Sequence, residues 1–288
     1  MKKSHLATLL IALAGALYGC LGFFGTLVIR EGISVSSMLF WRFLTATVFL
    51  LALGLKDVRE ASWKDLRTSA VPALLYCLST GTYFLSSRTI GTGLGMVIFF
   101  TYPVFIYLGL FFLMKEPITR QSWAALIVVA IGFTILNINL DTTLLGFEGV
   151  LFGMVSSLTW AAYMIISKRQ SRRINPMLTS FCLCAACSLY FLASTPMEGT
   201  LSIPRSPYCW LLILALGILP TSLPILLMLK GLKSISADRA GVLAVLEPVF
   251  TVFVGILFLH ETLTFTQMVG IAIILGGATG AGLGAAEG

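Results

Sequence analysis

Long apolar stretches alternate with short polar connections along the whole chain of 288 residues. A helix needs about 20 apolar residues to cross a hydrocarbon core of roughly 30 Å. The pattern contains about ten stretches of that length, so it predicts ten transmembrane helices. The expected spans are 6–29, 34–55, 67–86, 93–114, 121–138, 148–167, 177–195, 208–229, 240–259 and 266–285.

The connections between these spans are too short to hold a soluble catalytic domain, and the longest are 56–66, 139–147 and 196–207. Hydrophobic residues make up 58% of the chain, charged residues 11%, and the mean hydropathy is +0.97, which excludes an ordinary soluble domain. The first apolar run follows two lysines as in a signal peptide, but it continues to Ile29, so we interpret it as a retained span. We expect an all-α integral membrane protein that forms one membrane domain.

Basic residues gather on every second connection. Because cytoplasmic loops are rich in Lys and Arg, this pattern predicts that both termini are cytoplasmic. The outer connections hold only Arg30, Arg88 and Arg205, and Arg42 lies within the second span. The net charge of +7 then reflects topology, and we expect no nucleic-acid surface. The basic residues on the predicted inner side are Lys2, Lys3, Lys56, Arg59, Lys64, Arg67, Lys115, Arg120, Lys168, Arg169, Arg172, Arg173, Lys230, Lys233 and Arg239.

Two segments, TYPVFIYLGLFFLMKEPIT and LEPVFTVFVGILFLHETLT, match at a constant separation of 145 residues. The match indicates duplication of a five-helix unit. Because five is odd, the two halves, 1–140 and 146–288, are expected as inverted repeats around a central cavity, an arrangement that permits alternating access. The matching pairs are Pro103 with Pro248, Val104 with Val249, Phe105 with Phe250, Glu116 with Glu261, Thr119 with Thr264 and Gly132 with Gly277.

The YPVF and EPVF segments are each followed, after most of a span, by an acidic residue and a threonine in KEPIT and HETLT. Together with WRFLTA in the second span, they resemble the EamA branch of the drug/metabolite transporter superfamily. The resemblance covers essentially the whole chain. It implies a ten-helix carrier of the bacterial inner membrane that exports amino acids or other small metabolites. It also implies a cavity lined by spans 1, 3, 4, 6, 8 and 9, with spans 5 and 10 at the periphery.

Two charged residues lie at membrane depth, Glu247 in the ninth span and Arg42 in the second. A charge in hydrocarbon costs about 3 kcal/mol or more, so each residue needs a partner or a task. Glu247 either binds a substrate ammonium group or carries a coupling proton, or it pairs with Arg42 or a polar neighbour to fix the packing of the helices. Arg42 either attracts a substrate carboxylate or reaches the outer interface, and we favour its pairing with Glu247.

Four prolines interrupt the spans that the resemblance places around the cavity. Pro103 and Pro248 have no N–H, so each frees the carbonyl four residues before it for a ligand, a neighbour or water. Pro220 and Pro224 should bend the eighth span, which would shape a cavity or provide a hinge.

Aromatic residues are frequent in the same spans. Their rings offer apolar faces, cation–π contacts and hydroxyl groups to an amphipathic solute. Packing between helices is the alternative for all of them, and an interfacial belt is favoured for Tyr83, which lies near a helix end. The candidate substrate-binding residues are Tyr18, Tyr76, Phe99, Tyr102, Trp160 and Tyr163.

Small residues account for two further motifs. The glycines of GALYGCLGFFG and GGATGAGLG let helix backbones approach, and the cysteines of CLCAAC are best explained as small apolar residues. We expect no metal and no cofactor, because two histidines are too few and no C-x-x-C spacing has a histidine nearby.

Missing residues exclude several classes of function. An intramembrane protease needs paired Asp residues or a Ser with a base in the spans, but the four Asp residues fall in loops or at span ends. A sugar-phosphate exchanger needs Lys or Arg to meet phosphate, and only Arg42 qualifies. An ATP-binding G-x-x-x-x-G-K-[ST] motif is absent.

The prediction is therefore a secondary transporter, and not an enzyme. We expect it to export small amphipathic metabolites, above all aromatic or large neutral amino acids, by alternating access. The alternatives are efflux of cationic drugs or uptake of a nucleoside-like metabolite by the same fold. Its expected partners are a small-molecule solute and the lipid bilayer, and it would act as a monomer or a homodimer.

Overall fold

The computed structural model describes residues 2–113, 115, 120–136, 146–198, 201–259 and 265–283, and this part of the chain is helical without strands. Seven helical runs in it are long and apolar enough to cross a membrane, so the protein is a multi-pass membrane protein. Two shorter apolar helices cover Leu126–Ile135 and Met268–Gly277. The seven runs are His5–Arg30, Val35–Leu53, Leu94–Phe112, Phe147–Arg169, Pro176–Ser194, Pro207–Gly231 and Ala237–Phe258.

The first half of the chain contains eight α-helices and one π-helical turn among its described residues. Its elements are α1 (Lys2–Gly19), α2 (Leu21–Arg30), α3 (Val35–Leu53), α4 (Leu55–Arg59), α5 (Trp63–Ile90), α6 (Thr92–Phe99), α7 (Tyr102–Leu108), the π-helical turn Gly109–Leu113 and α8 (Arg120–Leu136). The predicted spans 6–29 and 93–114 are therefore not continuous helices, because each is interrupted near its middle.

The second half has seven α-helices in its described residues. Its elements are α9 (Phe147–Arg169), α10 (Pro176–Ser194), a 3₁₀ turn (Thr195–Glu198), α11 (Pro207–Gly217), the π-helical turn Ile218–Ser222, α12 (Leu223–Gly231), α13 (Ala237–Ala244), α14 (Leu246–Leu259) and α15 (Phe265–Leu283). The predicted spans 208–229 and 240–259 are likewise interrupted. Glu116, Thr119, Glu261 and Thr264 of the repeated motif lie outside the described residues.

Polar residues at the helix starts explain several of these boundaries. The side chains of Ser34 and Ser206 accept hydrogen bonds from the first turns of α3 and α11. Ser62 and Asp65 form a reciprocal capping box at the start of α5. The Ser62 hydrogen bonds hold the pKa of the exposed Asp65 carboxyl below its ordinary value.

The 28-residue helix α5 is missing from the seven apolar runs because its inner face is polar. That face is buried against α9 and α10. The Ser79 hydroxyl donates to the carbonyl of Ser156 at 2.9 Å, and the Ser156 hydroxyl donates to the carbonyl of Ser79 at 2.8 Å. Hydrogen bonds of this kind satisfy polar groups away from water, so α5 is stabilised between its neighbours despite its low apolar content.

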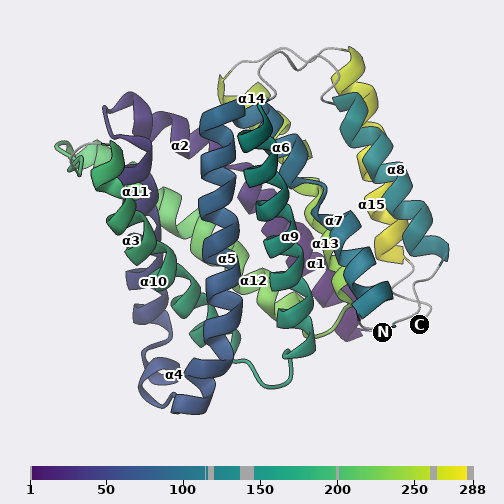
Figure 1. The fold of residues 1–288 in the computed structure, drawn as a ribbon, viewed down its shortest axis with the longest axis horizontal. Coiled ribbons are helices and arrows are strands. Elements are labelled where there is room, and N and C mark those ends of the chain that lie inside the picture. The colour runs from purple at the N-terminus through teal and green to yellow at the C-terminus, as the bar shows by residue number, and fades with distance from the viewer. Residues whose placement is uncertain are drawn as a thin grey trace.

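The helices form one bundle with a peripheral pair. The helices α5, α6 and α7 pack on α9, while α12, α13 and α14 pack on α1, and α3 lies against α10. At the right-hand edge of Figure 1, α8 and α15 lie side by side. A Cβ atom built on Gly132 would lie 2.9 Å from the carbonyl oxygen of Gly270, so the pair packs backbone to backbone.

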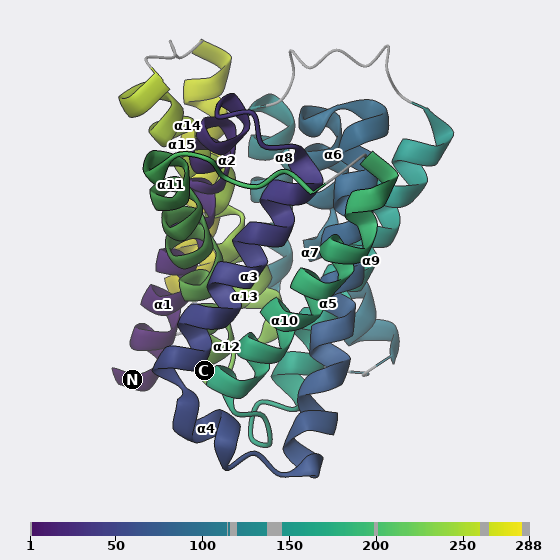
Figure 2. The ribbon, with the colours of Figure 1, turned by 90° about the vertical axis from the view of Figure 1, so that its left-hand side faces the viewer.

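The two ends of the bundle differ in chemistry. At the end that holds α4, at the bottom of Figure 2, the amide of Asn175 donates to Asp57 at 2.6 Å. This contact places the basic residues around 56–59 beside those around 168–173. Towards the opposite end, the backbone N–H of Ser202 donates to Ser37 at 2.9 Å, and the Trp41 indole donates to the Ser202 carbonyl at 2.9 Å.

Candidate functional site

Two discontinuous helices meet in the interior of the bundle. Helix α6 ends at Phe99 and α7 begins at Tyr102, while α13 ends at Ala244 and α14 begins at Leu246. The two breaks lie 145 residues apart, each just before one of the prolines Pro103 and Pro248. A broken helix exposes backbone polar groups in the interior, which is how many membrane carriers build a solute site.

The six candidate aromatic residues come together in one cluster around Trp160. The ring of Trp160 lies 5.3 Å from Tyr76, 5.4 Å from Phe99 and 5.4 Å from Tyr163, between centroids. Its distances to the rings of Tyr102 and Tyr18 are 6.0 Å and 6.4 Å. We call these six residues the ring cluster: Tyr18, Tyr76, Phe99, Tyr102, Trp160 and Tyr163.

The ring cluster is packed and buried. Tyr102 and Tyr163 are each 1% exposed, Tyr76 is 2% exposed, and Trp160 is 8% exposed. Phe99, the remaining member with Tyr18, is partly buried, and Tyr18 is buried. The rings therefore cover most of their apolar surface by packing against one another, and we call this packed state the closed arrangement.

Tyr83 is a neighbour of the ring cluster that was not among the candidate substrate-binding residues. Its ring centroid lies 5.4 Å from that of Phe99. Tyr83 lies seven residues after Tyr76, so both residues share one face of α5. This spacing was the feature of the sequence that could have placed Tyr83 near the candidate site.

Arg42 is buried on α3 and faces the broken eighth span. Its Nε donates to the hydroxyl of Thr221 at 2.7 Å, and the same hydroxyl donates to the carbonyl of Leu216 at 2.7 Å. Its guanidinium carbon also lies 4.8 Å from the ring centroid of Phe43. The π-helical turn Ile218–Ser222, which contains Pro220 and precedes Pro224, turns Thr221 towards Arg42.

Glu247 is partly buried in the first turn of α14. No direct ion pair joins it to Arg42, although both residues are described, so the favoured pairing of the two charges is not a contact in this structure. The Arg42 Nε is directed instead to Thr221 in the π-helical turn Ile218–Ser222. Glu247 instead lies against α1, where a Cβ atom built on Gly15 would be 3.6 Å from its backbone nitrogen.

Thr221 is the second residue that the sequence reasoning missed. It lies 145 residues after Tyr76, so the repeat that pairs Pro103 with Pro248 also pairs Tyr76 with Thr221. The same spacing relates Tyr102 to Glu247. The polar residues Thr221 and Glu247 thus occupy positions that match aromatic candidates of the first repeat. This correspondence could have been used to select polar site residues from the sequence.

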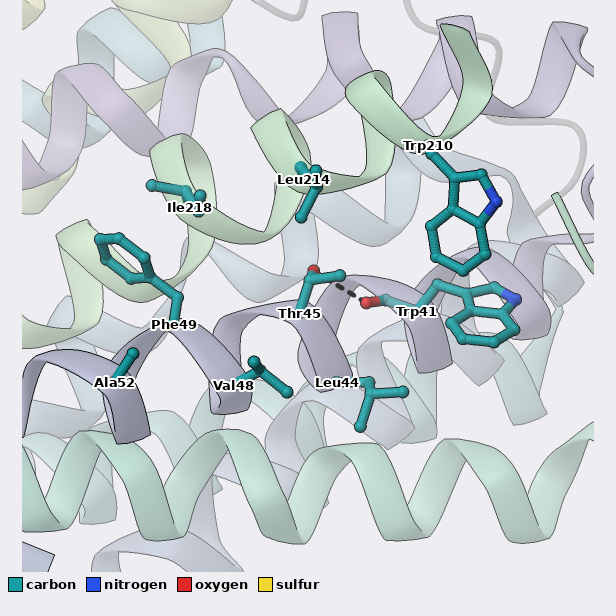
Figure 3. A pocket seen from close by; sticks show the side chains of 9 residues that line it. All are labelled: Trp41, Leu44, Thr45, Val48, Phe49, Ala52, Trp210, Leu214 and Ile218. Carbon is teal, nitrogen blue, oxygen red and sulfur yellow. Dashed lines mark hydrogen bonds between the residues drawn. The ribbon is translucent and has the colours of Figure 1, made fainter. Parts of the chain in front are cut away.

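The surface has a separate apolar groove of about 400 Å³ between α3 and α11, shown in Figure 3. Trp41 and Trp210 stand at one end of it with ring centroids 5.1 Å apart. Its one polar side chain, Thr45, donates back to the Trp41 carbonyl at 2.9 Å. This groove offers a solute almost no polar contact, so it does not compete with the ring cluster as a solute site. Its lining residues are Trp41, Leu44, Thr45, Val48, Phe49, Ala52, Trp210, Leu214 and Ile218.

Comparison with known proteins decides the family. The sequence profile of the EamA-like transporter family matches twice, at residues 5–138 and 147–283. The chain belongs to the EamA-like transporter family. As an EamA-like protein it is a transporter and not an enzyme, which confirms the assignment made from the sequence motifs.

Relatives of this EamA-like chain are also named as transporters. An uncharacterized transporter of Archaeoglobus fulgidus is 29% identical over 93% of both chains. The threonine/homoserine exporter RhtA of Escherichia coli K12 is 26% identical over 74% of this chain and 71% of its own length. A solved crystal structure superposes with a TM-score of 0.80 at 21% identity and covers 98% of each chain, which shows a shared fold.

Within the described residues, no group of three or more His, Cys, Asp or Glu side chains is placed to hold a metal ion. The chemistry available at the ring cluster is that of aromatic faces, hydroxyl groups, the indole N–H of Trp160 and the nearby carboxylate of Glu247. Such groups can bind a solute without covalent chemistry, and none of them is a nucleophile activated by a base.

Proposed function

We propose that this EamA-like protein is a secondary transporter of the bacterial inner membrane that exports small amphipathic metabolites, most of all aromatic or large neutral amino acids. One observation carries the proposal: the ring cluster gathers six aromatic residues from five helices, five of them buried, at the point where the two broken helices meet. Such a cluster suits an amphipathic solute with an apolar side chain and charged groups. The amino-acid exporter among the relatives supports the same substrate class.

The mechanism that we propose is alternating access between two inverted five-helix halves, 1–140 and 146–288, in a ten-helix protein. In this proposal α9 of the second half corresponds to α1 of the first. The packing of α5 on α9 then corresponds to that of α12 on α1, and the packing of α6 and α7 on α9 corresponds to that of α13 and α14 on α1. We name the first set the Trp160 group (α5, α6, α7 and α9) and the second the Glu247 group (α1, α12, α13 and α14). Rocking of one group against the other would open the ring cluster to either side in turn.

The breaks at Pro103 and Pro248, and the bend at Pro220 and Pro224, are the hinges of this motion. Glu247 is the proposed coupling residue, because it is a carboxylate beside the boundary that the motion would open and close. Both termini lie on the cytoplasmic side in this proposal. The basic segments around 56–59 and 168–173, which share one end of the bundle, support that orientation.

Counterflow in proteoliposomes tests the function. Vesicles are loaded in turn with unlabelled phenylalanine, tryptophan, methionine or threonine, and entry of trace labelled amino acid is followed. We expect saturable accumulation with the aromatic and large neutral amino acids and none in vesicles without protein.

Efflux of organic cations is the second candidate, because an aromatic cluster with a carboxylate that interacts electrostatically with Tyr18 and Tyr102 also suits a cation. Accumulation driven only by an organic cation or a nucleoside in the same assay would overturn the amino-acid assignment and leave the carrier fold unaffected.

A further inference from the structure

The indole N–H of Trp160 is buried inside the ring cluster and has no hydrogen-bond acceptor in the described part of the protein. A buried donor without an acceptor is unfavourable, and native interiors contain few of them. Trp41 shows the usual solution in the same bundle, since its indole donates to the Ser202 carbonyl at 2.9 Å. The unsatisfied donor of Trp160 therefore needs an explanation.

The side chains around Trp160 do not supply an acceptor. Five aromatic rings surround the indole at centroid distances between 5.3 Å and 6.4 Å. Four of these rings are tyrosines, but none of their hydroxyls accepts a hydrogen bond from the indole, and the hydroxyl of Tyr102 is itself directed to the carbonyl of Gly241 at 3.2 Å. A hydrogen bond from this buried donor to an incoming oxygen atom would be strong because water does not compete.

The two repeats differ where the broken helices resume. The residue 145 positions after Tyr102 is Glu247. The Trp160 group contributes Trp160 with four of the rings around it, whereas the Glu247 group contributes the ring of Tyr18 and the carboxylate of Glu247, which interacts electrostatically with Tyr18 and Tyr102. A zwitterionic amino acid carries the two complementary groups: a carboxylate oxygen that can accept from the indole N–H, and an ammonium group that can pair with the carboxylate of Glu247.

We propose that Trp160 determines specificity by donating its Nε1–H to a carboxylate oxygen of the substrate, while Glu247 meets the ammonium group. This inference rests on the proposed function and narrows it to solutes that carry an oxygen acceptor next to an apolar side chain. Arg42 is given no part in binding the carboxylate in this scheme, and its Nε donates to the Thr221 hydroxyl at 2.7 Å.

The first test observes the donor itself. The chain has five tryptophans, so ¹⁵N-indole labelling of the full-length protein in nanodiscs gives five indole signals, and the one lost in Trp160→Phe belongs to Trp160. Phenylalanine, 3-phenylpropionate and phenethylamine are then added separately. These probes share a phenyl ring, but phenethylamine has no carboxylate.

We expect phenylalanine and 3-phenylpropionate to shift the Trp160 N–H proton downfield and phenethylamine to leave it in place. A resonance that stays unmoved with all three probes, or that moves equally with phenethylamine, overturns the inference. This readout does not depend on transport. A downfield shift without amino-acid counterflow would contradict the proposed function but not this inference. Counterflow of phenylalanine without a shift would contradict this inference but not the proposed function.

A second test removes only the donor. In 3-benzothienylalanine a sulfur atom replaces the indole N–H, and the shape of the side chain is kept. Placed at position 160, it should weaken phenylalanine binding about tenfold to a hundredfold, the effect of losing a hydrogen bond to a charged group, and leave phenethylamine binding unchanged. The same replacement at Trp63, which is 81% exposed, is the matched control and should change neither. Equal losses for both ligands at position 160 would show a packing role and contradict the inference.

Discussion

The hydroxyl of Tyr102 donates a hydrogen bond to the carbonyl oxygen of Gly241, 3.2 Å away. Tyr102 begins α7 directly after the first helix break, and Gly241 lies in α13 directly before the second. The bond therefore joins the two discontinuous helices, one from each half of the chain. It stabilises the closed arrangement of the ring cluster.

Replacement of Tyr102 with Phe keeps the ring and removes this bond. We expect Tyr102→Phe to destabilise the closed arrangement by about 1 kcal/mol, the usual net value of such a hydrogen bond. The purified variant should show a lower unfolding midpoint in detergent than the wild type. Tyr208→Phe is the control, because Tyr208 is 53% exposed. Equal midpoints for all three proteins would show that the bond does not stabilise the protein.

The contact between Arg42 and Thr221 should be worth more, because one partner is charged and buried. Thr221→Val leaves the guanidinium without its hydroxyl partner, and we expect a loss of about 1.5–3 kcal/mol. In Arg42→Met the charge is gone, so a further Thr221→Val change should cost less than it does in the wild type. Thermal unfolding of the two single variants and the double variant measures this coupling. Strictly additive effects would contradict the contact.

Gly19 should not tolerate a side chain, whereas Gly22 should. A Cβ atom at Gly19 would lie 2.6 Å from the Cβ of Phe250 and 2.9 Å from the backbone nitrogen of Thr251, so α1 and α14 would have to separate. We expect Gly19→Ala to cost about 1–3 kcal/mol. At Gly22 nothing lies within 4 Å, and Gly22→Ala should leave the unfolding midpoint unchanged or higher. The opposite order of the two midpoints would refute the close packing of α1 on α14.

Much of the fold followed from local patterns. Apolar length marked the helices, and the 145-residue spacing of Pro103 and Pro248 marked both helix breaks. The interruption of the first span at Cys20 had no such marker, since no proline lies there. It coincides with a tertiary contact that the sequence does not reveal, the close approach of Gly19 to Phe250.

The site was only partly predictable for the same reason. Aromatic residues in spans of one repeat could be chosen from sequence, but which polar residue would satisfy Arg42 depends on how α3 packs beside the π-helical turn. The sequence has one charge of each sign at membrane depth, which favoured an ion pair between Arg42 and Glu247. In the structure the hydrogen-bond partner of Arg42 is the hydroxyl of Thr221. Likewise, the orphan indole N–H of Trp160 is a property of its surroundings and has no sequence signature.

Glu247 should carry the coupling proton if transport is driven by a pH gradient. Glu247→Gln cannot ionise, so we expect the variant to lose the dependence of uptake on an imposed pH gradient and to keep passive exchange. Glu148→Gln, an exposed change in the first turn of α9, is the control and should behave as the wild type. A Glu247→Gln variant with unchanged gradient dependence would exclude this role.

The most direct test of the account is counterflow of labelled phenylalanine with a ring removed from the cluster. We predict that Tyr76→Leu raises the concentration of phenylalanine for half-maximal accumulation about tenfold, because the variant loses an aromatic face from the site. Tyr208→Leu, outside the cluster, should match the wild type. If Tyr76→Leu accumulates phenylalanine with wild-type affinity, or if the wild type accumulates none, the ring cluster is not an amino-acid site.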